Sequence, residues 1–137
     1  MATHLRKSAL DKLERQPYRF EFFQAVRLLR WLGSRGKKNK SNKSTKPIGR
    51  DFSPQEEIVR FKTLPSHRFP QGEISDFKFV GNDATGVAGP PKMTVPFMGM
   101  TGPSGALPRH YTQLVIDRTR KKDHALRNFL DLFNHRI

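Results

Sequence analysis

Two stretches near the N-terminus have the hydrophobic spacing of helices. The first, residues 5–14, is followed by Pro17, which interrupts it and can begin the next helix. The second, residues 18–32, has apolar side chains at i, i+3, i+4, i+7 and i+10, and Gly33 is placed to cap its end. Its stripe consists of Phe22, Ala25, Val26, Leu29 and Leu32. We therefore predict two N-terminal helices.

The second predicted helix carries aromatic residues away from that stripe. Phe20 and Trp31 project about 180° from it when successive residues turn by about 100°. They bracket Gln24 and Arg27 along one ridge. Aromatic residues on opposite faces are typical of a helix buried on both sides. Either a later part of the fold or a partner subunit covers the second face, and the sequence leaves both open.

The middle of the chain changes to short strand patterns. Residues 57–62, 74–80 and 93–98 alternate apolar and polar side chains, with Val59 and Phe61 on one side of the first segment. Pro96 cannot donate a ladder hydrogen bond, so the last segment is predicted to be an edge strand at best. Residues 81–92 are rich in glycine and proline and are predicted to form a flexible loop.

The C-terminal third returns to helical spacing. One helix is predicted from Pro108, with Leu107, Tyr111, Leu114 and Val115 as its apolar positions. Asp123 can cap a last helix, and the stripe of that helix is Leu126, Phe129, Leu130, Phe133 and Ile137. Because the stripe runs to the last residue, we expect the chain to be the N-terminal portion of something longer. The predicted class is α+β: N-terminal helices, a small irregular sheet and C-terminal helices in an incomplete domain.

The basic charge of the chain is unevenly distributed. The net charge is +14, and residues 35–46 carry six basic side chains and no acidic or apolar one. Such a segment gains nothing from burial, so a flexible linker is predicted. Its lysines suit either phosphate binding or a solvated loop. No aromatic residue stands among them to stack on bases, which favours the solvated loop.

No catalytic pattern emerges from the sequence. The absence of cysteine excludes disulfides, thiolate zinc sites and a cysteine nucleophile. Gly99, Gly102 and Gly105 depart from both phosphate-loop motifs, and Pro103 removes a backbone donor, so these glycines are read as turn residues. Glu56 and Glu57 are expected to face opposite ways. We predict no enzyme, no cofactor and no metal site, and a cytoplasmic protein without a membrane span.

Four segments, in this order, resemble a known family. They are Glu14-Arg-Gln-Pro-Tyr-Arg-Phe-Glu-Phe-Phe-Gln-Ala-Val-Arg-Leu-Leu, Gly49-Arg-Asp-Phe-Ser-Pro-Gln-Glu-Glu-Ile-Val-Arg-Phe, Phe97-Met-Gly-Met-Thr-Gly-Pro-Ser-Gly-Ala-Leu-Pro-Arg-His-Tyr-Thr and Phe129-Leu-Asp-Leu-Phe-Asn-His-Arg. Together they are similar to the N-terminal part of TssG (ImpH, VasB), a baseplate subunit of the type VI secretion system. Residues 35–46 and 81–92 lie outside the resemblance.

The resemblance implies a structural wedge protein that joins two copies of TssF and links to TssE and the adaptor TssK during contractile tail assembly. It implies no small-molecule substrate and a position at the cytoplasmic face of the inner-membrane complex. The alternative function is a nucleic-acid-binding module acting through residues 35–46 and the C-terminal helices. Aromatic residues dominate interface energetics. The candidate partner-binding residues are Phe20, Phe22, Phe23, Arg27, Trp31, Leu107, Arg109, His110, Tyr111, Phe129 and Phe133.

Overall fold

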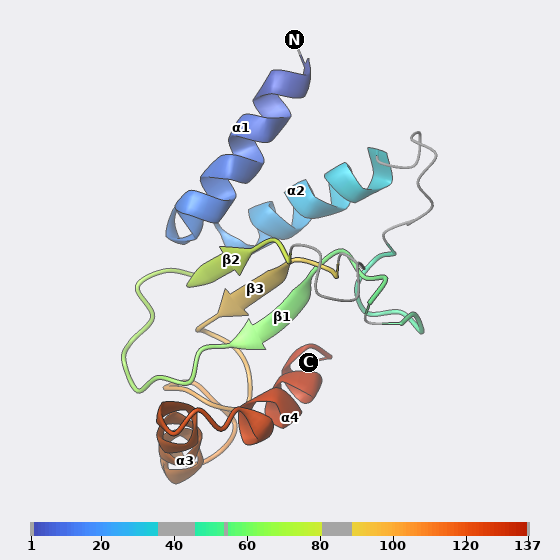
Figure 1. Ribbon diagram of the computed structural model, residues 1–137. Coiled ribbons are helices and arrows are strands. Elements are labelled where there is room, and N and C mark those ends of the chain that lie inside the picture. The colour runs from blue at the N-terminus through green and yellow to red at the C-terminus, as the bar shows by residue number, and fades with distance from the viewer. Residues whose placement is uncertain (1, 36–45, 54, 81–88, 137) are drawn as a thin grey trace.

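The computed structural model describes residues 2–35, 46–53, 55–80 and 89–136. The elements in chain order are α1 (Ala2–Arg15), the 3-10 helix η1 (Pro17–Arg19), α2 (Phe22–Arg35), β1 (Arg60–Thr63), β2 (Asp76–Lys78), β3 (Lys92–Val95), α3 (Arg109–Arg120) and α4 (Ala125–Asn134) (Figure 1). This arrangement confirms the predicted α+β class.

The two segments predicted to be flexible lie mostly outside the described residues. At the ends of the predicted linker, Arg35 closes α2 and Lys46 forms an isolated parallel bridge with Glu57. At the end of the predicted loop, Lys92 already belongs to β3.

The strands form a mixed three-stranded sheet in the order β1-β3-β2. β3 pairs with β1 in parallel and with β2 antiparallel, so it is the central strand. The prediction that Pro96 confines this segment to an edge was therefore wrong. The strand ends at Val95, one residue before the proline, and the missing N–H group falls outside the ladder.

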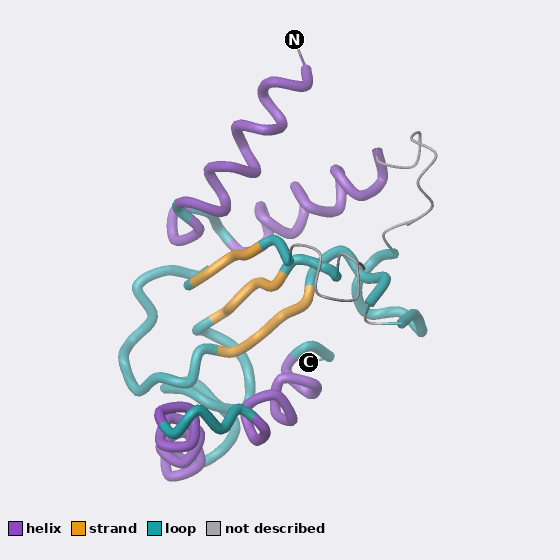
Figure 2. The backbone as a smooth tube through the Cα atoms, in the orientation of Figure 1, coloured by secondary structure: helices purple, strands orange, loops and turns teal. Residues whose placement is uncertain are grey.

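The N-terminal and C-terminal helices lie on opposite sides of the strands, and the C-terminal pair lies beyond the β1 edge (Figure 2). α1 and α2 are on one side, while α3 and α4 are on the other, where α4 contacts β1. The core lies between the sheet and the N-terminal helices, because alternate strand residues point toward Ala25 and Leu29 of α2. The buried strand side chains include Phe61, Met93 and Phe77, which are partners across the three strands, and Thr63 and Val95, which form the next buried pair.

The start of α2 differs from the sequence prediction. Pro17 begins a separate 3-10 turn, and Phe20 follows in an extended conformation, with its side chain packed against the core. The helix begins only at Phe22, whose N–H donates to Glu73 Oε2 at 2.6 Å. A single ridge carrying both Phe20 and Trp31 is therefore wrong, although the apolar stripe of α2 is confirmed. Gly33 continues the helix and does not end it.

The inward face of α3 was also assigned incorrectly. Of the predicted apolar positions within this helix, only Val115 is buried, together with Thr112. Tyr111 and Leu114 are each 43% exposed. Among the described residues, no helix is both long and apolar enough to cross a lipid bilayer.

Candidate functional site

Helix α4 lies along the outer edge of β1 (Figure 1). The helix and the residue that follows it present polar side chains to this strand. In a parallel pair, alternate N–H groups of an edge strand point away from the neighbouring strand and need other acceptors. On β1 these belong to Phe61 and Thr63. The Phe61 N–H donates to His135 Nδ1 at 3.2 Å, and the Thr63 N–H donates to Asp131 Oδ1 at 3.1 Å. The helix thus completes the edge with side-chain acceptors.

Asn134 extends these contacts to the segment that follows β3. We call the three residues Asp131, Asn134 and His135 the polar seam. Its Oδ1 accepts from the Met100 N–H at 2.9 Å, and its Nδ2 donates to Asp131 Oδ1 at 3.1 Å. The seam requires glycine at position 99, where φ is +127° and a Cβ would lie 2.2 Å from Thr63 Oγ1. Two of the segments that resemble the TssG family, residues 97–112 and 129–136, therefore contact each other at the edge of the sheet.

A buried charged cluster closes the end of the seam. Glu57 is 1% exposed; its carboxylate contacts His135 Nε2 and lies 3.2 Å from Arg136 Nη1. Since His135 Nδ1 accepts a hydrogen bond from Phe61, the proton of the neutral ring sits on Nε2 and is donated to Glu57. Arg136 also donates to the carbonyl oxygens of Arg50 and Phe52, each at 3.3 Å. The cluster fastens the C-terminal turn to the segment before β1.

The predicted opposition of Glu56 and Glu57 is confirmed. Glu56 is exposed and pairs with Lys46 at 2.6 Å, while Glu57 points inward. They lie in the bridge and turn before β1, not on a regular strand.

The glycine-rich loop after β3 uses its amides internally. The Gly102 N–H donates to Thr112 Oγ1 at 3.1 Å, and the Gly105 N–H donates to the Gly102 carbonyl at 3.1 Å. A Cβ on Gly105 would lie 2.7 Å from the Met100 carbonyl oxygen, so the tight turn requires glycine. These donors are occupied and do not form a phosphate cradle, which confirms the structural interpretation of the motif.

The outward face of α4 is apolar. Phe129, Leu132 and Phe133 are 55%, 54% and 48% exposed, and the two phenylalanine rings meet edge to face at 5.2 Å. The predicted helix is confirmed, but of the four stripe residues that the structure describes only Leu130 is buried, and Ile137 lies outside the described residues. Large apolar groups at i, i+3 and i+4 that face solvent are typical of an interaction surface.

The other candidate residues are dispersed. Phe20 packs against the core, while Phe22 contacts Phe61, Phe97 and the exposed Phe23, each with ring centroids 5.4 Å apart. The rest lie on α2 or around the start of α3. These are Arg27 and Trp31, which are exposed on α2; Leu107, which is half-buried; and Arg109, His110 and Tyr111, which are exposed on α3.

Sequence reasoning missed the seam residues Asp131, Asn134 and His135, and it missed Glu57 as their partner. One signal was present: Asp131 and His135 are four residues apart, so they share one side of a helix. The long-range partners at positions 57, 61 and 63 carry no such local signature.

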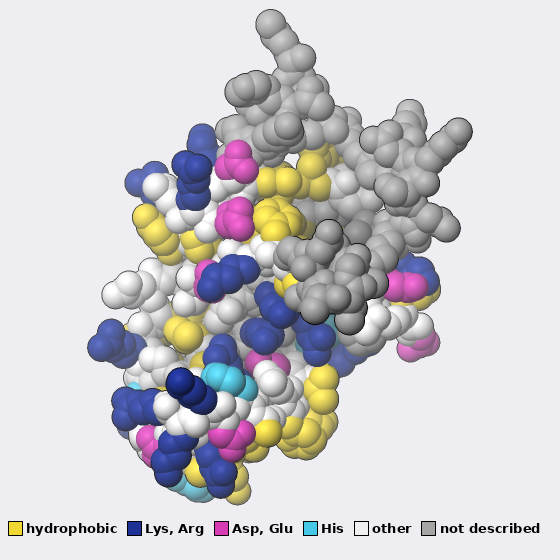
Figure 3. Space-filling model, in the orientation of Figure 1, with side chains coloured by type: hydrophobic (Ala, Val, Ile, Leu, Met, Phe, Trp, Pro, Cys, Tyr) yellow, Lys and Arg dark blue, Asp and Glu magenta, His cyan; other side chains and the backbone are white. Residues whose placement is uncertain are grey.

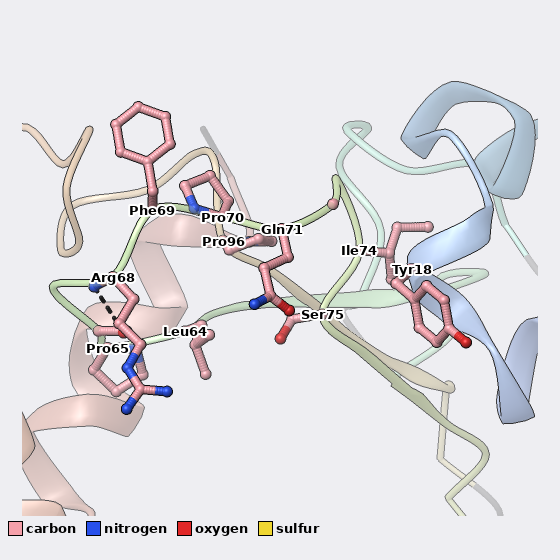
Figure 4. A pocket seen from close by; sticks show the side chains of 12 residues that line it. Tyr18, Leu64, Pro65, Arg68, Phe69, Pro70, Gln71, Ile74, Ser75 and Pro96 are labelled. Atoms are coloured by element: carbon pink, nitrogen blue, oxygen red, sulfur yellow. Dashed lines mark hydrogen bonds between the residues drawn. The ribbon is translucent and has the colours of Figure 1, made fainter.

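A cleft of about 510 Å³ lies between the 3-10 turn and the loops that flank β2 and β3 (Figure 4). Tyr18 lies at one end, and Phe69 points out from the other side. Of the 12 lining residues only Arg68 is charged, so the cleft holds no acid–base pair. Across the described residues, no three His, Cys, Asp or Glu side chains gather to hold a metal ion.

The chain matches the type VI secretion TssG family over residues 16–137. No curated protein and no solved structure shows significant similarity to it. The match includes α2, the sheet, the glycine-rich loop and the complete polar seam of α4. The chain therefore belongs to the type VI secretion TssG family and is a component of that secretion system.

Proposed function

We propose that the chain is a structural wedge subunit of the type VI baseplate and binds a TssF-like subunit through the outward face of α4. In the proposal, two TssF copies, TssE and TssK surround it, and the assembly docks at the cytoplasmic face of the inner-membrane complex. Its role is structural and not catalytic. Membership of the TssG family supports the assignment to the type VI secretion system. The exposed apolar face of α4 is the observation that supports the proposed contact with a TssF-like subunit.

The orientation of α4 supports this contact. The inward side of the helix is polar because it serves the N–H groups of β1, so its aromatic side chains must face outward. Leu114 and Tyr111 add exposed apolar area on α3, which contacts α4. Burying such side chains releases about 25 cal/mol per Å² of apolar surface. A second layer over α4 would recover that free energy.

The test is co-purification of the chain with the TssF-like subunit of its own secretion system. Replacing both aromatic residues (Phe129→Ser with Phe133→Ser) should lower capture at least tenfold, because central aromatic residues dominate interfaces. The matched control is Tyr18→Ser with Phe69→Ser, which removes two exposed rings from the cleft. Capture by this control should stay within twofold of the wild-type chain. Equal capture by both double variants would contradict the proposed contact.

A further inference from the structure

The sheet face opposite the core carries an aligned row of cations. Arg60 is the cross-strand partner of Lys92, and Lys92 is the partner of Lys78. Partner side chains lie on the same face, so three basic groups stand side by side across β1, β3 and β2. In the next row, Lys62, Thr94 and Asp76 are partners, so this face also holds one carboxylate. Figure 3 shows Lys and Arg side chains gathered over the strands on this face.

This basic sheet face (Arg60, Lys62, Lys78 and Lys92) is poorly compensated within the described chain. Lys78 pairs with Asp76 at 3.2 Å, and among the described residues Arg60, Lys62 and Lys92 make no ion pair. Like charges directly opposite each other on a sheet destabilise it. The arrangement therefore opposes folding.

The pKa of the half-buried Lys62 is affected by the same repulsion between cations. Burial lowers the pKa of Lys62; the carboxylate of Asp131 opposes that effect, while Lys92, Arg127 and Arg60 lower the pKa further. An anionic group placed on this face would offset the cross-strand repulsion, and its charge would favour the protonated form of Lys62.

We propose that the basic sheet face binds an acidic segment of a partner protein. The cations are held on rigid strands about 4.8 Å apart, with alternate residues of one strand roughly 7 Å apart. Carboxylates at i, i+3 or i+4 of a helix have a similar spacing of about 5–6 Å. A glutamate-rich helix can therefore lie across the strands with its charges opposite these cations.

The chemistry of this face favours protein over nucleic acid. Sheets that bind single-stranded nucleic acid stack bases on aromatic side chains. The described part of these two rows holds no aromatic residue, because Phe61, Met93 and Phe77 point to the opposite face. A flat three-stranded surface also offers no helix or ribbon to enter the major groove. This contact is separate from the proposed α4 contact and does not depend on it.

The test uses the full chain and a fluorescein-labelled glutamate-rich helical peptide, read by anisotropy at low and high salt. Replacing two aligned cations (Arg60→Gln with Lys92→Gln) should weaken peptide binding at least tenfold at low salt, and the difference should shrink as salt screens the charges. The matched control, Arg30→Gln with Arg120→Gln, removes the same charge from exposed sites on α2 and α3. It should stay within twofold of wild type.

A stability measurement separates binding from folding. Because Lys92 stands between two cations, Lys92→Gln should keep or raise the melting temperature while it lowers peptide affinity. Lys78→Gln, at a highly exposed site, provides a second variant if the double variant unfolds. Equal losses in the face and control variants would overturn the proposal, as would unchanged peptide binding. Tighter binding of a single-stranded or duplex oligonucleotide through the same cations would overturn it in favour of nucleic acid.

Discussion

Helices α2 and α4 are both amphipathic, but α2 packs its apolar face against the sheet and α4 packs its polar face against it. α2 packs Ala25 and Leu29 against the sheet. In contrast, Asp131 of α4 and its C-cap residue His135 contact the sheet, and Phe133 is left half-exposed. The difference follows from what each helix meets. α2 meets a sheet face, which presents apolar side chains, and α4 meets a sheet edge, which presents backbone N–H groups. A helix on an edge must supply hydrogen-bond acceptors.

The two helices also begin differently. The first amide of α2 is capped by Glu73, 51 residues away in the sequence. The first amide of α4 donates at 3.1 Å to Asp123 Oδ1, only two residues before it. The start of α2 therefore depends on tertiary structure, whereas α4 carries its own start signal.

The largest expected effect comes from breaking the polar contact of α4. His135→Ala removes the acceptor of the Phe61 N–H and leaves Glu57 buried without its imidazole partner. A buried polar group left without its hydrogen-bond partner costs about 1–3 kcal/mol, and more when it is charged, so the loss of both contacts should lower the free energy of unfolding by roughly 3–5 kcal/mol. Denaturant unfolding measures this change, with Asn128→Ala on the exposed side of α4 as the control.

A double variant extends this prediction. If His135 and Glu57 act as one unit, His135→Ala with Glu57→Ala should be less destabilising than the sum of the single variants. If the loss in the double variant equals the sum of the two single losses in free energy of unfolding, the two residues act independently, which would contradict a buried contact between His135 and Glu57.

The next effect compares one leucine from each helix. Leu29→Ala on α2 should lower the free energy of unfolding by about 3 kcal/mol, because the side chain is 5% exposed and its loss leaves a cavity. Leu132→Ala on α4 should lower it by about 1 kcal/mol or less, since that side chain already faces solvent. The same unfolding experiment compares them. Equal losses would contradict the outward orientation of α4.

The smallest expected effect concerns the start of α4. The backbone hydrogen bond from Ala125, assisted by Arg118, holds the pKa of Asp123 below its usual value of 3.8. The stabilisation is therefore complete above about pH 4 and is lost as the pH falls through the lower pKa of the folded state. The difference in melting temperature between wild type and Asp123→Asn should therefore shrink as the pH falls through this range. For the control Asp51→Asn, at an exposed site, the difference in melting temperature from wild type should not shrink in this way.

Parts of this architecture were predictable because their signals are local. The alternation around Phe61 predicted β1, the stripe through Leu29 predicted α2, and Asp123 predicted the start of α4. Prediction failed where a distant residue decided the outcome: Glu73 sets where α2 begins, and pairing on both sides makes β3 central. The aromatic residues of α4 were identified as candidate contacts, but the sequence did not show that they face solvent.

The sequence by itself determined the α+β class, the family resemblance, the existence of the helices and the glycine turns after β3. These follow from periodicity, from short motifs and from backbone conformations that few residues adopt. Only the tertiary structure decided which face of α4 is buried, that Glu57 meets His135, and that Arg60, Lys92 and Lys78 form one row. Periodicity shows that a helix or strand has two faces, but the surface it packs against decides which face turns inward.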